Sequence, residues 1–470
     1  MFSDRLVSVL IVLGIFFFIF PNKTYAHEEN SIEVLMYNDH YEPKDFEIEK
    51  GEEVRFINKS ESLRWPASNI HPTHEIYSEF DPKEGIQPGE TWSFVFTKPG
   101  VWKYHDHLNP QIVGNITVTG EPDIEQVSLT FKQKFDIWWE DANINLIKFY
   151  YSVFPDQQEK ALKDIDMRKL VEDKTLLSRD IKIFSAETLM KKLLADSGDG
   201  YNFDCHREAH IIGRETFKII GAKVFELTGS ECHSGFYHGA MEELIIEKGE
   251  ADLQHNVEDI CNIFTTNFGS FECFHGVGHG VMAYVDYNLP EALEICNGFE
   301  TSFERSSCAG GVFMENIVAG QGNASIEGHQ TNWLSDDMQF PCNTSNIWYQ
   351  KEQCYLMQTS WMLYKNNYDF EKVSGLCSEA DPEFIKTCYQ SYGRDASGFY
   401  LRDPKKTLSA CSIVPSQNFT DCVSGGVQVV LDFWGEGVGN KGYEFCQAIE
   451  EDSAKKACNS LVDNRMTMFK

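Results

Sequence analysis

The spacing of the cysteines limits what this chain can fold into more than any other feature of its sequence. All 14 cysteines lie at or after Cys205, and six pairs share a separation of 11 or 12 residues. The six pairs are Cys261/Cys273, Cys296/Cys308, Cys342/Cys354, Cys377/Cys388, Cys411/Cys422 and Cys446/Cys458. Their first members recur every 34 or 35 residues, apart from one step of 46. This period predicts a repeat array, and an even cysteine count in an exported chain predicts disulfides formed in an oxidising compartment.

Each repeat is predicted to be a helical hairpin closed by its own disulfide. On a straight helix, residues 11 or 12 positions apart would lie about 16 to 18 Å apart, whereas bonded cysteines need a Cα separation of roughly 4.4 to 6.8 Å. A turn must therefore lie between them, and the intervening stretches contain Gly, Pro, Asn and Ser. Glycines close to the second cysteine, as in CAGG and CVSGG, would allow close helix packing.

Such short hairpins bury an apolar face only by stacking on their neighbours. Residues 201–470 are therefore expected to form an all-α, disulfide-braced solenoid or closed ring. The array has a general similarity to Sel1-like repeats, although their consensus and tighter cysteine spacing do not match this sequence. That resemblance implies the helical-repeat architecture and nothing more.

The N-terminus has the pattern of a secretory signal peptide. Arg5 precedes the apolar run VSVLIVLGIFFFIF, and Thr-Tyr-Ala precedes His27. Residues 1–26 are therefore predicted to be removed, with the alternative that they stay as an N-terminal anchor. We expect a secreted, periplasmic or cell-surface protein without a transmembrane domain after cleavage, because no later apolar run approaches about 20 residues. The formal net charge of −31 leaves no basic surface evident, so nucleic acid is not an expected partner.

Residues 27–120 are predicted to be an all-β domain. Short apolar runs such as IEVLMY, EVRFIN, TWSFVF and GNITVTG are separated by turn residues at the spacing of a sandwich. The stretches FEIEKGEEVRFIN and IQPGETWSFVFTKPGVWKYHDHLNPQIVGNITV closely resemble the cupredoxin pattern, and the resemblance covers residues 30–118. It implies a Greek-key β-sandwich with a metal site at one end.

The chain departs from the blue-copper members of that family at each ligand position. Those members use a Cys, two His and a weak Met. Aligned on Gly114, this chain has Asp106 at the Cys, Asn109 at the second His and Ile112 at the Met, with Arg64 and Trp65 near the upstream His. The domain contains no cysteine. An intense blue thiolate centre is therefore excluded.

Four histidines in the same domain are candidate metal ligands. His71 and His74 lie in RWPASNIHPTH, and His105 and His107 lie in WKYHDHLNP. Both segments resemble those of a cupredoxin subgroup, which implies a shared role for these histidines. Imidazoles without a thiolate would suit Cu(II) or Zn(II). The alternative is that the histidines brace two loops by hydrogen bonds, with Asp106 as their partner.

The segment 121–200 is predicted to be a helical connector. It carries WWEDANINLIKFYYSVF and ALKDIDMRKLVEDKTLL, with helical spacing of the apolar residues. We expect its aromatic side chains to pack against a neighbouring element rather than to bind a ligand.

A second histidine cluster lies at the start of the cysteine-rich region. The sequence places two pairs at i, i+4, where both side chains share a helix face. The candidate metal ligands are His206, His210, His238, Glu242, His275 and His279. His238 and His279 each lie six residues after the second cysteine of their repeat, so they should meet on adjacent helices. In the competing interpretation, each histidine caps or bridges helices separately.

The sequence favours a secreted metal-binding protein, most plausibly for copper or another divalent metal such as zinc, acting in metal handling or redox. Its expected partners are a metal ion and a protein or redox partner. One alternative is a metal-dependent exported enzyme with the helical cluster as its active site. Another is a cell-surface binding module whose histidines are structural. The sequence does not decide whether the protein turns over a substrate.

Overall fold

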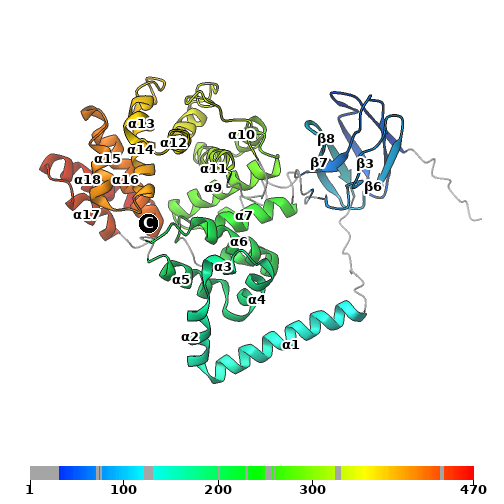
Figure 1. Ribbon diagram of the computed structural model, residues 1–470, viewed down its shortest axis with the longest axis horizontal. Coiled ribbons are helices and arrows are strands. Elements are labelled where there is room, and N and C mark those ends of the chain that lie inside the picture. The colour runs from blue at the N-terminus through cyan, green and yellow to red at the C-terminus, as the bar shows by residue number, and fades with distance from the viewer. Residues whose placement is uncertain are drawn as a thin grey trace, which may run out of the picture.

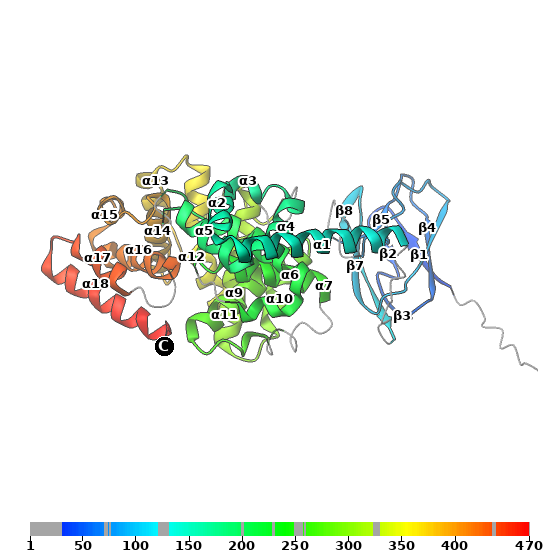
Figure 2. The same cartoon turned by 90° about the horizontal axis from the view of Figure 1, so that it is seen from below.

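The structure, a computed structural model, describes residues 31–69, 74, 77–120, 131–198, 202–227, 231–248, 257, 260–322, 330–434 and 439–469. A β-sandwich occupies one end of the molecule and an array of helices occupies the other (Figure 1, Figure 2). The expected two-part architecture, all-β followed by all-α, is confirmed. Within the described ranges, no helix combines the length and apolarity that a membrane crossing requires. The segment predicted to be a signal peptide lies outside these ranges.

The β-sandwich consists of two four-stranded sheets. One has the order β2-β1-β4-β6, and the other has the order β3-β8-β7-β5. The strands of the first sheet are β1 (Ile32–Met36), β2 (Tyr41–Glu42), β4 (Glu53–Asn58) and β6 (Thr91–Val95). Those of the second are β3 (Asp45–Glu49), β5 (Pro66–Ser68), β7 (Gly100–Asp106) and β8 (Asn109–Thr119). β1 pairs in parallel with β4, and β3 with β8, because the chain crosses between the sheets.

Alternating side chains form the core of the sandwich. In β4, Val54, Phe56 and Asn58 are buried while the residues between them are partly or fully exposed, as a period of two requires. Phe56 packs against an aromatic cluster that contains Phe80, and their ring centroids are 5.4 Å apart. This core fixes β5 and β7, and these two strands lead into the loops that carry the histidines of the domain.

The first helices precede the cysteine-rich region. They are α1 (Phe131–Val153), α2 (Pro155–Asp164), α3 (Met167–Leu170), α4 (Lys174–Phe184) and α5 (Ala186–Asp196). α4 and α5 contact the first helix of the array. The expectation that the aromatic residues here are packed is wrong for part of α1, because Trp138 and Trp139 are 59% and 56% exposed. Tyr151 does pack, stacking on Phe184 at 5.7 Å.

The cysteine-rich region consists of helices that stack in chain order. Its long helices are α6 (His206–Ile220), α7 (Gly235–Lys248), α9 (Asn267–Tyr284), α11 (Ser302–Gly320), α12 (Trp348–Lys365), α14 (Ile385–Phe399), α16 (Phe419–Trp434) and α18 (Asp452–Arg465). Shorter helices precede several of them, namely α10 (Leu289–Asn297), α13 (Phe370–Cys377), α15 (Pro404–Cys411) and α17 (Gly439–Gln447). Each long helix contacts the next one along the chain.

All six predicted disulfides are confirmed, and Cys205 bonds to Cys232 as a seventh. From Cys296/Cys308 onwards, each bond joins the segment before a long helix to the first turns of that helix. Their Cα–Cα separations are 5.4 or 5.6 Å. The turn that the spacing requires lies between the two cysteines in each case. The disulfides therefore act locally, and packing between helices holds neighbouring repeats together.

Glycines bring neighbouring long helices close together. A Cβ on Gly239 of α7 would lie 1.9 Å from the carbonyl oxygen of His210 on α6. Likewise, a Cβ on Gly311 of α11 would lie 1.9 Å from the carbonyl oxygen of His275 on α9. No side chain fits at that distance, so only glycine allows these backbones to touch. The expected role of the repeated glycines is confirmed.

The array curves until distant repeats touch. The final 3-10 turn η4 (Met466–Phe469) contacts α9, where the ring of Phe469 stacks on Phe268 at 4.3 Å. Arg402 Nη1 lies 3.1 Å from Asp204 Oδ2, which joins the segment between α14 and α15 to the start of α6. Of the two predicted shapes, these contacts favour the closed ring over the open solenoid. Figure 1 shows the C-terminal end lying towards the middle of the helical region.

The sandwich and the helices share a small polar contact. Lys103 on β7 forms an ion pair with Glu291 on α10, with 2.6 Å between Nζ and Oε1. Tyr284 on α9 donates a hydrogen bond from its hydroxyl to the carbonyl oxygen of Val101. The Lys103 ammonium also lies 5.1 Å from the centre of the Tyr284 ring. The ammonium is therefore held by both a carboxylate and an aromatic face.

Candidate metal centres

Three histidines of the sandwich come together. His74, His105 and His107 each offer one ring nitrogen, and these nitrogens lie within 4.8 Å of one another. His105 belongs to β7, His107 follows a bulge at the end of that strand, and His74 lies in the loop after β5. We call them the sandwich triad. The fourth candidate, His71, lies outside the described residues.

A carboxylate orients His74 of the sandwich triad. His74 Nδ1 lies 2.5 Å from Asp81 Oδ2, and Asp81 also accepts a hydrogen bond from the indole of Trp65 at 2.8 Å. Burial would raise the pKa of Asp81, but hydrogen bonds from Lys83 and His74 hold it below its usual range. The ionised carboxylate makes His74 Nδ1 the donor, so Nε2 is the ring nitrogen left to bind an ion. This nitrogen faces His107 Nδ1 at 3.0 Å.

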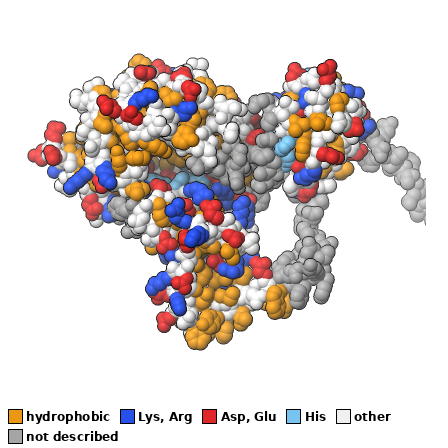
Figure 3. All heavy atoms as spheres, in the orientation of Figure 1, with side chains coloured by type: hydrophobic (Ala, Val, Ile, Leu, Met, Phe, Trp, Pro, Cys, Tyr) orange, Lys and Arg blue, Asp and Glu red, His pale blue; other side chains and the backbone are white. Residues whose placement is uncertain are grey.

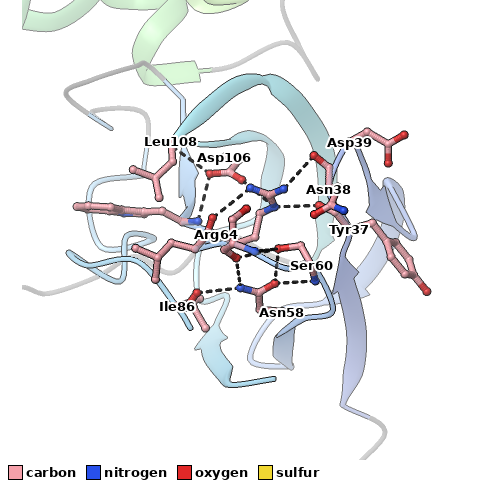
Figure 4. A network of polar contacts seen from close by, with 12 residues as sticks. Tyr37, Asn38, Asp39, Asn58, Ser60, Arg64, Ile86, Asp106 and Leu108 are labelled. Atoms are coloured by element: carbon pink, nitrogen blue, oxygen red, sulfur yellow. Dashed lines mark hydrogen bonds and ion pairs between the residues drawn. The ribbon is translucent and has the colours of Figure 1, made fainter. Parts of the chain in front are cut away.

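Asp106 does not contact the histidines as their hydrogen-bond partner. Its Oδ1 accepts hydrogen bonds from the backbone amides of Trp65 and Leu108, at 3.2 and 3.0 Å. Its Oδ2 lies 3.5 Å from Arg64 Nε, and Arg64 donates to the carbonyl oxygens of Tyr37 and Asn38 (Figure 4). The loop-bracing alternative had named Asp106 as the partner of the histidines. The carboxylate that fills that role is Asp81.

The helical histidines converge from three successive helices. His206 and His210 lie on α6, His238 on α7, and His275 and His279 on α9. The rings of His238 and His279 stack, with centroids 5.3 Å apart and an interplanar angle of 21°. The predicted register between repeats is thus confirmed. The same offset brings Ser360 and Arg394 together in later repeats, where Arg394 donates to the serine hydroxyl at 2.7 Å.

Two of these rings point their Nε2 atoms at each other. His206 Nδ1 lies 2.8 Å from the carbonyl oxygen of Cys232, which can only accept, so this nitrogen must carry the proton. His210 Nδ1 lies 2.9 Å from Glu242 Oε1. Burial would raise the pKa of Glu242, but Arg214 and His210 hold it below its usual range, so the carboxylate also accepts. Both Nε2 atoms therefore carry lone pairs, and they lie 3.1 Å apart.

The electrostatics keep these rings uncharged. Burial first, and then the neighbouring His210, lowers the pKa of His206 to about 3. Burial and neighbouring imidazoles place the pKa values of His238 and His275 well below their usual range. Neutral imidazole is the form that binds a metal. No proton is then available to separate the facing lone pairs of His206 and His210.

Two glutamates that the sequence argument missed complete the cluster. His279 Nδ1 lies 3.0 Å from Glu315 Oε2 on α11, and the hydroxyl of Tyr287 donates to Glu315 Oε1 at 2.7 Å. His238 Nε2 lies 3.0 Å from Glu272 Oε2 on α9. Buried nitrogens without a hydrogen-bond partner remain on three rings, namely His238 Nδ1, His275 Nδ1 and His279 Nε2.

The described residues thus offer two triads in the helical cluster. One consists of His206, His210 and His238, and the other of Glu242, His279 and Glu315. His275 borders both, with its ring 5.3 Å from His238 and 5.1 Å from His279, but belongs to neither. His206 is the only partly exposed member, so the cluster opens on its side. Histidine side chains are visible in a hollow of the helical region (Figure 3).

Comparisons with known proteins concern the sandwich. The family model described as a cupredoxin-like domain matches residues 9–118. A purple cupredoxin from Nitrosopumilus maritimus is similar at 22% identity over 19% of this chain and 100% of its own, with a TM-score of 0.17. An amicyanin variant in its Cu(I) form is 21% identical over 19% of this chain and 82% of its own, also with a TM-score of 0.17.

A copper-containing nitrite reductase from Thermus scotoductus SA-01 is 23% identical over 19% of this chain, with a TM-score of 0.17, and the match spans 23% of the reductase. No curated protein sequence matches the chain. The family model and the two-sheet topology agree on the N-terminal part, and seven disulfides brace the helices that follow. The chain therefore carries a cupredoxin-like domain joined to a cysteine-rich helical domain.

Proposed function

We propose that this chain is an exported copper-binding protein that holds metal both at the sandwich triad and in the helical histidine cluster. The cupredoxin-like domain suggests copper binding or redox chemistry as the general class of function. The seven disulfides agree with an oxidising compartment outside the cytoplasm. The two centres together suit metal handling or electron transfer with a redox partner.

The distance between facing ring nitrogens is the observation that supports the proposal most directly. Two ligands held about 2.0 to 2.1 Å from one ion, at an angle of roughly 90 to 110°, lie roughly 2.8 to 3.4 Å apart. His206 Nε2 and His210 Nε2 are 3.1 Å apart, and His74 Nε2 and His107 Nδ1 are 3.0 Å apart. Without a cation, the lone pairs of the first pair would repel each other. A shared metal ion removes that repulsion.

The anchoring of each ring supports the same proposal. His74 is fixed by Asp81, His206 by the Cys232 carbonyl and His210 by Glu242, always through the nitrogen that does not face the neighbouring ring. Histidines that bind metals characteristically donate their second N–H to a carboxylate or carbonyl. Both centres would bind through imidazole without a thiolate, which suits Cu(II) or Zn(II) and gives at most weak colour with copper.

Metal analysis of three full-length proteins with intact disulfides tests the proposal. The wild type, loaded with Cu(II) and dialysed, should retain stoichiometric metal. His210→Ala/His279→Ala should lose the helical share, and His105→Ala/His107→Ala should lose the sandwich share. A wild type that retains no metal after loading would contradict the proposal. Equal metal retention by all three proteins would mean that the substituted histidines have a structural role and do not bind the metal.

A further inference from the structure

We propose that the helical cluster binds two divalent cations, with the second ion held by Glu242, His279 and Glu315. The inference rests on the proposed function and extends it, since that function requires only one ion in the helical cluster. The first ion would lie on the imidazole triad of His206, His210 and His238.

The second triad has the geometry of a separate site. Its three residues each provide one ligand atom, and these atoms lie within 4.8 Å of one another. Ligands bound at about 2.0 to 2.2 Å around one ion lie no more than roughly 4.4 Å apart, so a small contraction would close the site. All three residues are about 1% exposed. The site is thus enclosed by α7, α9 and α11 rather than laid on the surface.

An unpartnered nitrogen indicates a missing partner at this triad. His279 Nδ1 faces Glu315, but its Nε2 is buried without a hydrogen bond, as is Nδ1 of the adjacent His275. Leaving a buried polar atom unpaired is unfavourable, because it loses its hydrogen bonds to water without gaining a partner. A metal ion would satisfy a ring nitrogen of His279, with His275 available as a neighbouring donor.

The charge balance also calls for a cation. The triad brings the carboxyl groups of Glu242 and Glu315 together in a buried place, where uncompensated charge is costly. Arg214 lies 3.4 Å from Glu242 Oε2 and supplies one positive charge. A divalent cation bound between the two carboxyl groups would offset charge that is buried there.

The two ions would be linked and would differ in their ligands. Glu242 Oε1 accepts from His210 Nδ1, so one carboxylate belongs to the second triad and at the same time orients a ligand of the first. The first triad offers only imidazole, which suits copper and zinc. The second offers two carboxylates and one imidazole, which suits zinc or a harder ion such as Mn(II).

Zinc stoichiometry of the full chain tests this inference. His105→Ala/His107→Ala serves as the parent, because it removes the sandwich triad as a metal site. After loading with Zn(II) and dialysis against a chelator of micromolar affinity, the parent should retain two zinc ions. Adding Glu315→Gln should reduce this to one. Adding Glu243→Gln should leave two, because Glu243 is the neighbouring carboxylate on α7 and lies in neither triad.

X-ray absorption on the loaded parent gives a measurement that does not depend on how the Glu315→Gln variant folds. Two zinc ions with mixed nitrogen and oxygen ligands would agree with the inference. One retained zinc with nitrogen ligands, unchanged by Glu315→Gln, would overturn the second ion and leave the proposed function standing. No retained zinc would overturn the helical centre itself, and the inference with it.

Discussion

The two histidine centres of this chain use the same ligand type on different scaffolds. The sandwich triad lies on one strand and two loops, and its His107 is partly exposed. The helical cluster lies on helices packed through glycine contacts, and two of its carboxylates share helices with its imidazoles, while Glu315 comes from α11. Loops can adjust to an ion or release it, whereas helices fixed by their neighbours hold the ligands in place. Under the proposed function, the sandwich triad would exchange its metal and the helical cluster would retain it.

Of the changes considered, metal removal should alter the stability of the two domains most. An ion present at about 1,000 times its dissociation constant stabilises the folded state by about 4 kcal/mol. In the helical domain the first ion would join α6 to α7 and the second would join α7, α9 and α11, while the sandwich strands are already joined by their sheets. Chelation should therefore lower the helical unfolding transition in calorimetry more than the sandwich transition. A larger shift of the sandwich transition would mean that the sandwich triad, and not the helical cluster, is the centre that retains its metal.

A glycine substitution should show how helix packing affects metal retention when every ligand residue is left unchanged. Gly311→Ala would place a methyl group 1.9 Å from the carbonyl oxygen of His275, which forces α9 and α11 apart. Overpacking of this kind costs about 1 to 3 kcal/mol. We expect a lower urea midpoint by circular dichroism and weaker metal retention in the helical cluster. The matched control is Gly375→Ala in α13, where nothing lies within 4 Å and helix propensity predicts a small gain. Equal effects of both changes would argue against glycine-dependent packing.

The smallest expected effect concerns the carboxylate behind the sandwich triad. Asp81→Asn removes the charge that orients His74, and loss of such a partner typically weakens metal binding 10–100-fold, or about 1.4 to 2.7 kcal/mol. Copper titration calorimetry in the His210→Ala/His279→Ala background measures the sandwich centre alone. Asp45→Asn is a suitable control, because Asp45 accepts a hydrogen bond from Asn115 across the β3–β8 pairing and does not belong to the sandwich triad. Unchanged affinity in Asp81→Asn would mean that His74 is not a ligand.

The local features of the helical domain could be predicted because they depend on short stretches of sequence. A separation of 11 or 12 residues between bonded cysteines demands a turn wherever it occurs. The repeat period then gives the register, and the register correctly placed His238 beside His279. Short apolar runs separated by turn residues likewise predicted the β-sandwich, and apolar residues at helical spacing predicted the helical part.

The features that could not be predicted depend on three-dimensional detail. Glu315 lies seven residues after Cys308, one beyond the offset that aligned the histidines, so only the rotation of α11 turns it towards His279. Asp81 lies in an irregular segment without periodicity. Closure of the ring depends on small rotations that add up over the repeats, and no single repeat encodes their sum. An i, i+3 spacing of Glu272 and His275 was the one available signal for a further carboxylate.

The stacking of Phe469 on Phe268 joins the last turn of the chain to a helix that is synthesised much earlier. A chain is made from its N-terminal end, so the histidines of α6, α7 and α9 leave the ribosome well before η4 does. During that interval the cluster exists without the segment that packs against α9. Under the proposed function, an ion could bind these imidazoles before η4 packs against α9. Metal content would then depend on what the chain meets during its synthesis and export as much as on affinity in the finished protein.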